Sequence, residues 1–110
     1  MPEKKTSLPS PPPRRQEIVF RAVNVVPMRT DTVLEAQDVV VRIGVITSIG
    51  PTGQVKWSDA ALVIDASGKF LMPGLVEMHA HVPPHDDLES MQEVLWLFAL
   101  NGVTTIRGML

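Results

Sequence analysis

The chain of 110 residues contains no cysteine. It can therefore form no disulfide framework and no thiolate metal site, so any metal ion must be held by nitrogen and oxygen ligands. The first sixteen residues, MPEKKTSLPSPPPRRQ, also lack the apolar core of a secretory signal or membrane span. We expect residues 1–16 to be a disordered, proline-rich tail, with a polyproline II ligand in PSPPP as the alternative.

A clustered basic surface is missing as well. Four of the ten basic residues and one of the twelve acidic residues lie in the first fifteen positions, which leaves a net charge of −5 for the rest of the chain. A mildly acidic body argues against nucleic-acid binding. We expect an ordinary globular protein with no nucleic-acid or membrane partner, and a cytoplasmic location because the start lacks a signal.

Short runs rich in valine and isoleucine dominate residues 17–72. EIVFRAVNVV, DVVVRIGVITSIG and ALVIDASGKFLM have strand length and end at turn-forming residues. We predict a small antiparallel β-sandwich-type domain over this range. Gly44 is expected to turn the second run back as a hairpin, although Ile43 beside it is a poor turn residue.

The pattern changes after His81. Asp86 and Glu89 resemble a capping box, and Leu88, Met91, Leu95 and Phe98 form an apolar stripe at helical spacing. The helix should end near Asn101, with Gly102 in the left-handed conformation. Together with strands at 75–80 and 103–107, this helix predicts a βαβ unit with parallel strands, in a second domain covering 73–110.

Two of the three histidines, His79 and His81, lie one residue apart in LMPGLVEMHAH. Alternate side chains of a strand point to the same face, so both imidazoles could bind one metal ion. They would also lie at the carboxyl end of a parallel strand, where α/β folds place their chemistry. His85, with a neighbouring aspartate, could supply a third ligand, but simple exposure is the competing interpretation. Glu77 shares the parity of the pair and would need a partner if buried.

These segments resemble the amidohydrolase superfamily, closest to its imidazolonepropionase-like branch. FLMPGLVEMHAHV looks like the first barrel strand of that family, and NGVTTIRGML looks like the second. The runs DVVVRIGVITSIGP and VIDASGKFLMPG are similar to the β-domain that precedes the barrel. The resemblance covers residues 18–110 and departs from the family at Gly108, where many relatives have aspartate.

The resemblance implies a function. His79 and His81 would be the first two ligands of a divalent ion, zinc being the expected one, in a hydrolase of C–N bonds that acts on a small amide-type substrate. The remaining ligands and the general base would come from later strands of a (β/α)8 TIM barrel. No catalytic residue is expected within this chain.

Thirty-six residues from Leu75 onward suffice for one βαβ unit, whereas such a barrel takes about 250 residues. We therefore expect an N-terminal fragment with an incomplete barrel, inactive by itself. Two alternatives remain open: a non-catalytic β-domain that acts as an interaction module, and a metal binder whose site is completed by dimerisation. The sequence leaves the oligomeric state undetermined.

Overall fold

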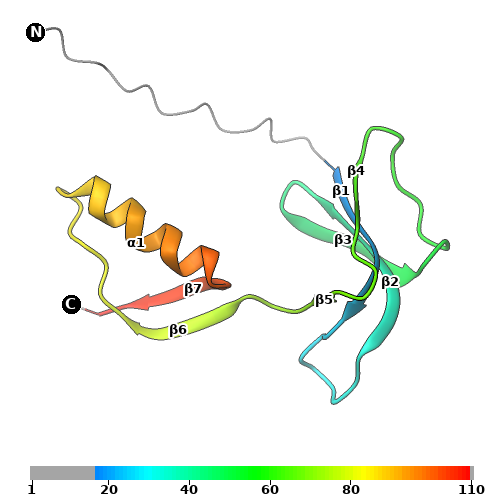
Figure 1. The fold of residues 1–110 in the computed structure, drawn as a ribbon, viewed down its shortest axis with the longest axis horizontal. Coiled ribbons are helices and arrows are strands. Elements are labelled where there is room, and N and C mark those ends of the chain that lie inside the picture. Colours follow the sequence, from blue (N-terminus) through cyan, green and yellow to red (C-terminus); the bar gives the residue numbers. More distant parts are fainter. Residues whose placement is uncertain (1–16, 110) are drawn as a thin grey trace, which may run out of the picture. The chain divides into compact units, whose positions relative to one another are not determined.

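The computed structural model describes residues 17–109, so the predicted tail with its polyproline II alternative lies outside the described residues. The described chain forms two compact units (Figure 1), the first ending at Leu71 and the second beginning at Met72. No helix within 17–109 has the length and apolar character needed to cross a bilayer.

The first unit is a single mixed sheet. Its five strands are β1 (Glu17–Val25), β2 (Leu34–Arg42), β3 (Val45–Pro51), β4 (Leu62–Asp65) and β5 (Phe70–Leu71). The order is β3-β2-β1-β4, and β5 continues alongside β1 beyond the end of β4. The pairs β1–β2 and β2–β3 are antiparallel as predicted.

The prediction of an antiparallel sandwich is wrong in two respects. Both β4 and β5 run parallel to β1, and the described strands of this unit form one sheet where a sandwich would have two. Residues 52–61 carry the chain from the end of β3 to the start of β1, where Leu62 pairs with Ile18. Short β-rich runs do not by themselves distinguish parallel from antiparallel pairing, so this crossover could not be predicted from the sequence.

The core of the first unit consists of small branched side chains. One buried cluster contains Val23, Val25, Val39 and Ala66. Val19 and its register partner Val40 are also fully buried, outside that cluster. These valines account for the β-rich pattern of the sequence, since β-branched side chains pack well on a pleated sheet.

A buried carboxylate holds an irregular part of this sheet. Asp38 is completely buried, and its two oxygens accept hydrogen bonds from the backbone N–H of Ala22 at 3.0 Å and of Gly53 at 2.9 Å. Ala22 has φ +56° and lies where β1 gains one residue over β2. The carboxylate therefore satisfies a donor that the bulge leaves without a ladder partner.

The hairpin predicted at Gly44 is confirmed. Ile43 and Gly44 join β2 to β3 with φ values of +51° and +75°, as a two-residue hairpin turn of type I′ requires. Glycine adopts this conformation freely, whereas a β-branched residue crowds its own carbonyl there. Ile43 is thus a strained position, and its side chain is 71% exposed.

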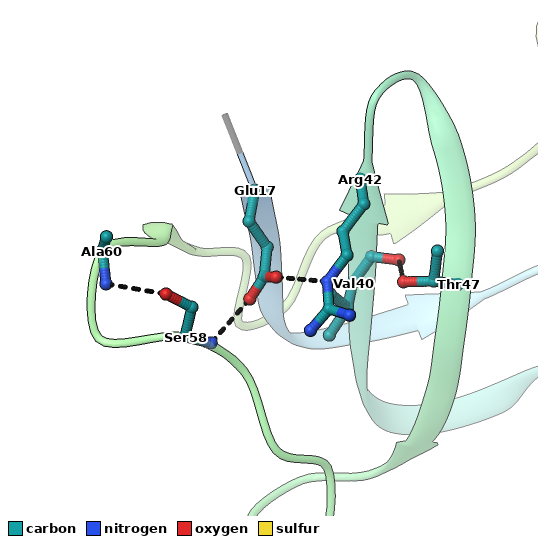
Figure 2. A network of polar contacts seen from close by, with 6 residues as sticks. All are labelled: Glu17, Val40, Arg42, Thr47, Ser58 and Ala60. Atoms are coloured by element: carbon teal, nitrogen blue, oxygen red, sulfur yellow. Dashed lines mark hydrogen bonds and ion pairs between the residues drawn. The ribbon is translucent and has the colours of Figure 1, made fainter. Parts of the chain in front are cut away.

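The crossover segment is attached to the start of β1 (Figure 2). Glu17 accepts a hydrogen bond from the Ser58 backbone N–H at 2.7 Å and forms an ion pair with Arg42. The Ser58 hydroxyl oxygen accepts from the Ala60 N–H at 3.1 Å. The Ser58 N–H, helped by Arg42, holds the pKa of the Glu17 carboxyl below its ordinary value.

The second unit is the predicted βαβ unit, with β6 (Leu75–Ala80), α1 (Leu88–Leu100) and β7 (Val103–Gly108). The two strands pair in parallel, and α1 contacts β7 (Figure 1). Gly74 enters β6 so close to β7 that an added Cβ would lie 1.8 Å from the Thr104 hydroxyl oxygen. Only glycine fits there without a shift of the neighbouring strand.

The helix begins one residue later than predicted. Asp87, and not Asp86, is the N-cap, and its side chain accepts from the Ser90 N–H at 3.1 Å. The predicted end is confirmed, with Asn101 as C-cap and Gly102 at φ +81°.

The predicted apolar stripe of α1 is only partly correct. Met91 and Phe98 are half-buried, but Leu88 and Leu95 are exposed, and Val94 takes part in the covered face. A pair of strands is narrow, so it covers a narrower face of the helix than a wide sheet would.

Candidate metal-binding site

The two histidines lie at the carboxyl end of β6. His79 is the penultimate residue of the strand, and His81 follows directly after Ala80. Ala80 is buried and points away from solvent, whereas both histidines are exposed. This alternation is the one predicted from the sequence, and it leaves both imidazoles accessible to a ligand or ion.

The two rings converge. Their Nε2 atoms are 3.3 Å apart, the ring centroids are 5.2 Å apart, and the ring planes are inclined at 66°. Two nitrogens bound to one tetrahedral zinc ion at about 2.0–2.1 Å lie roughly 3.3 Å apart, so the spacing fits a shared ion. At the same distance, an Nε2–H of one neutral ring can also donate to the other ring. The geometry of the pair therefore fits a shared metal ion. Without a metal, a hydrogen bond between the two rings can keep them in this arrangement.

Glu77 has a defined partner. Its side chain is half-buried, and Oε1 accepts a hydrogen bond from the backbone N–H of His79 at 2.9 Å. The sequence analysis expected a partner for a buried carboxylate at this position. That partner is the backbone N–H of His79. β6 gains one residue over β7 between Glu77 and Ala80, so strict alternation does not hold there, and the sequence did not reveal this contact.

The structure does not bring a third ligand to the pair. Among residues 17–109, no group of three or more histidine, aspartate or glutamate side chains lies close enough together to hold a metal ion. His85 is exposed, and Asp87 is engaged as the cap of α1. The suggestion that His85 and a neighbouring aspartate complete the site is thus not supported by this arrangement.

A shallow apolar hollow of about 320 Å³ lies on α1, and it is lined by Gln92, Leu95, Trp96 and Ala99. None of these side chains is a metal ligand or a nucleophile. This hollow therefore offers no metal-binding or nucleophilic group.

Comparison with known proteins places this geometry in context. No family model matches the chain. An adenine deaminase of Ruegeria sp. (strain TM1040) is 35% identical over 66 residues, which are 60% of this chain and 11% of the deaminase. The dihydroorotase of Mycobacterium tuberculosis (strain ATCC 25618 / H37Rv) is 38% identical over 77 residues, 68% of this chain and 17% of that enzyme. The chain is related to the amidohydrolases.

Solved structures agree on the fold. Molinate hydrolase superposes with a TM-score of 0.71 at 21% identity, over 84% of this chain and 23% of that chain. A protein described as an amidohydrolase gives a TM-score of 0.70 at 22% identity, over 84% of this chain and 25% of that chain. These solved structures therefore support the mixed α/β fold, and the curated relatives confirm the family resemblance found in the sequence. The chain spans between 11% and 17% of the length of the curated relatives named above.

Proposed function

We propose that the chain is the N-terminal part of a metal-dependent amidohydrolase that hydrolyses C–N bonds of small amide-type molecules. His79 and His81 are its first two metal ligands, and zinc is the expected ion. The observation that carries the proposal is the 3.3 Å separation of the two Nε2 atoms at the carboxyl end of a parallel strand. The relation to adenine deaminases and dihydroorotases supports the reaction class.

In this proposal β6, α1 and β7 are the first βαβ unit of a (β/α)8 barrel. When bound, a divalent ion would polarise the scissile carbonyl and lower the pKa of a water molecule. The chain's own part is to hold the two imidazoles at the strand end, with their Nε2 atoms close enough to bind one ion. The family resemblance assigns the other ligands and the general base to later barrel strands, so no catalytic step is assigned to residues 17–109.

The substrate class follows from the relatives only in outline. Adenine and dihydroorotate, after which two relatives are named, are both small nitrogen-containing rings. We extend this to a small molecule with an amide-type C–N bond, without choosing the ring. The proposal includes a cytoplasmic location, which fractionation of the native source would test.

Metal titration of the 110-residue chain tests the site. We expect Zn²⁺ to bind with one ion per chain, and His79→Ala and His81→Ala each to weaken binding at least tenfold. His85→Ala is the matched control, because it removes an exposed histidine of the same unit, and it should leave the affinity unchanged. Equal affinities for all three variants and the parent chain would refute the assignment.

Stoichiometry separates the alternatives. One ion per two chains, with dimer formation on adding zinc, would favour a site completed by a second copy.

Assays of dihydroorotate and adenine hydrolysis should find no turnover by this chain. Metal-dependent turnover would contradict the proposal that essential groups lie elsewhere.

A further inference from the structure

β6 contains one residue more than its partner at the point where the histidines begin. Glu77 is in register with Ile106 and Ala80 with Gly108, so β6 advances three residues while β7 advances two. Met78 and His79 have no register partner in β7. This is a β-bulge, which is uncommon between parallel strands and is often found beside functional sites, where it redirects a side chain.

A bulge leaves a backbone donor without a ladder acceptor. Here the His79 N–H donates to Oε1 of Glu77, two residues earlier, at 2.9 Å. Regular pairing is resumed when the Met109 N–H donates to the Ala80 carbonyl oxygen at 2.8 Å. The Glu77 carboxylate therefore replaces a backbone acceptor of β7 where the ladder is interrupted between Glu77 and Ala80.

The bulge lies beside the converging rings. In a regular strand, alternate residues lie about 7 Å apart at Cα and their side chains run side by side. The Nε2 atoms of His79 and His81 are instead 3.3 Å apart, with ring planes inclined at 66°. An added residue bends its strand locally and redirects the side chains there, and His79 is one of the two residues of β6 at this bulge.

We propose that Glu77 is a positioning residue of the histidine pair. By accepting the His79 N–H, its carboxylate fixes the bulge in β6 and thereby sets the distance between the two Nε2 atoms. This inference rests on the proposed metal site for its functional meaning, while the Glu77 contact itself can be measured without metal. The required property is an oxygen acceptor at the end of the side chain, and not its charge.

The test uses four variants of the 110-residue chain. Glu77→Gln keeps an acceptor and removes the charge. Glu77→Asp keeps both, because an aspartate commonly bonds the N–H two residues later. Glu77→Ala and Glu77→Met remove the acceptor, and the methionine variant preserves side-chain length in case the alanine variant does not fold. Glu93→Ala, an exposed glutamate of α1, is the control.

Two readouts are combined. Zn²⁺ affinity should fall roughly 10–100-fold in Glu77→Ala and Glu77→Met, the range typical of residues that orient metal ligands, and stay within about threefold in the other variants. In the metal-free chain, the His79 amide should exchange slowly and resonate downfield in the parent, Gln and Asp forms, and lose both features in the Ala and Met forms.

The outcomes are distinguishable. Unchanged zinc affinity in the Ala and Met forms would overturn the proposal. Loss of affinity in the Gln form with an unaltered His79 amide would also overturn it, because charge would then be the operative property. If the parent chain binds no zinc, the proposed metal site fails, and the amide comparison still decides whether Glu77 fixes the bulge.

Discussion

The two units of the chain differ in how completely their apolar side chains are covered. In the first unit, a five-stranded sheet contains fully buried valines such as Val19 and Val39, and a buried carboxylate accepts from the backbone at the bulge of β1. In the second unit, Ala80 is the one buried residue among those described, and α1 has none. Both units form the secondary structure that their sequence patterns predict. Regular hydrogen bonding therefore needs only local pattern and pairing, whereas a core needs apolar surfaces on every side.

The exposed apolar side chains of the second unit lie on both β6 and α1. Trp96 is 65% exposed and Leu97 is 62% exposed. In the proposed complete barrel, a helix of this kind would be covered by neighbouring helices and strands. The comparison between the units can be tested with one fluorescent probe for each, because Trp57 belongs to the first unit and Trp96 to the second.

The largest effect is expected at Asp38. Asp38→Ala would remove the acceptor of the Ala22 and Gly53 N–H groups, with a loss of about 3–5 kcal/mol from two hydrogen bonds to a fully buried carboxylate. A loss of this size is enough to unfold a small domain. Urea unfolding followed by Trp57 fluorescence in a Trp96→Phe background measures it.

The control for this prediction is Asp59→Ala, which removes an exposed aspartate of the same unit and should change stability by less than about 0.5 kcal/mol. A similar unfolding midpoint for the two variants would mean that the buried carboxylate contributes nothing specific.

The next effect compares one large-to-small substitution in each unit. Val39→Ala removes two methyl groups from a fully buried position and should lower the free energy of unfolding by about 2 kcal/mol. Leu97→Ala removes a larger side chain that is mostly exposed, and should change stability by less than about 0.5 kcal/mol. Single-tryptophan versions of each variant, unfolded in urea, give the two values. If Leu97→Ala lowered the free energy of unfolding more than Val39→Ala, α1 would be covered in solution, and the two units would not differ in the way described.

A smaller, stabilising effect is expected at the β2–β3 turn. Ile43→Asn should raise the free energy of unfolding of the first unit by about 1 kcal/mol, because asparagine adopts a positive φ more readily than a β-branched residue. Ile43→Val serves as control, since it keeps the branch and should leave stability unchanged. Thermal unfolding of both variants decides the matter. Equal melting temperatures for the asparagine and valine variants would argue against strain at this position.

The smallest effect concerns pH. The pKa of Glu17 is lower in the folded chain, chiefly through the Ser58 N–H, so its contribution to stability is present above about pH 4.3, the ordinary pKa of glutamate, and is lost as the pH falls further. Glu17→Gln should therefore flatten the acid side of the stability profile of the first unit. Asp65, whose pKa is lowered by the Ser67 hydroxyl and N–H, would retain part of the slope.

Urea unfolding between pH 3 and pH 6, followed by Trp57, measures the two profiles. Glu35→Gln, at an exposed position of β2, should keep the parent profile. A parent-like slope in Glu17→Gln would show that the Ser58 contact does not persist in solution.

Local features of this protein could be predicted from the sequence because each depends on a few neighbouring residues. The hairpin at Gly44, the end of α1 at Asn101 and Gly102, and the βαβ order all followed from turn chemistry and periodicity. The start of α1 was wrong by one residue, since Asp86 and Asp87 are both suitable caps and only the path of the preceding loop selects between them.

Features that depend on segments far apart in the chain could not be predicted from the sequence. The parallel pairing of β4 with β1 requires the crossover at 52–61, and the choice of Asp38 as the acceptor for Ala22 requires two strands in a particular register. The bulge at Met78 and His79 arises in the same way, because register is a property of a strand pair and not of either strand alone.

The sequence by itself determined that His79 and His81 share a strand face, since side chains alternate along any strand. It also determined the family resemblance, which lies in the order of motifs. Only the tertiary structure decided that the two Nε2 atoms approach to 3.3 Å and that Glu77 accepts the His79 N–H. The reason is that the strand period fixes the direction of a side chain, whereas distances at a strand end are set by the pairing with β7.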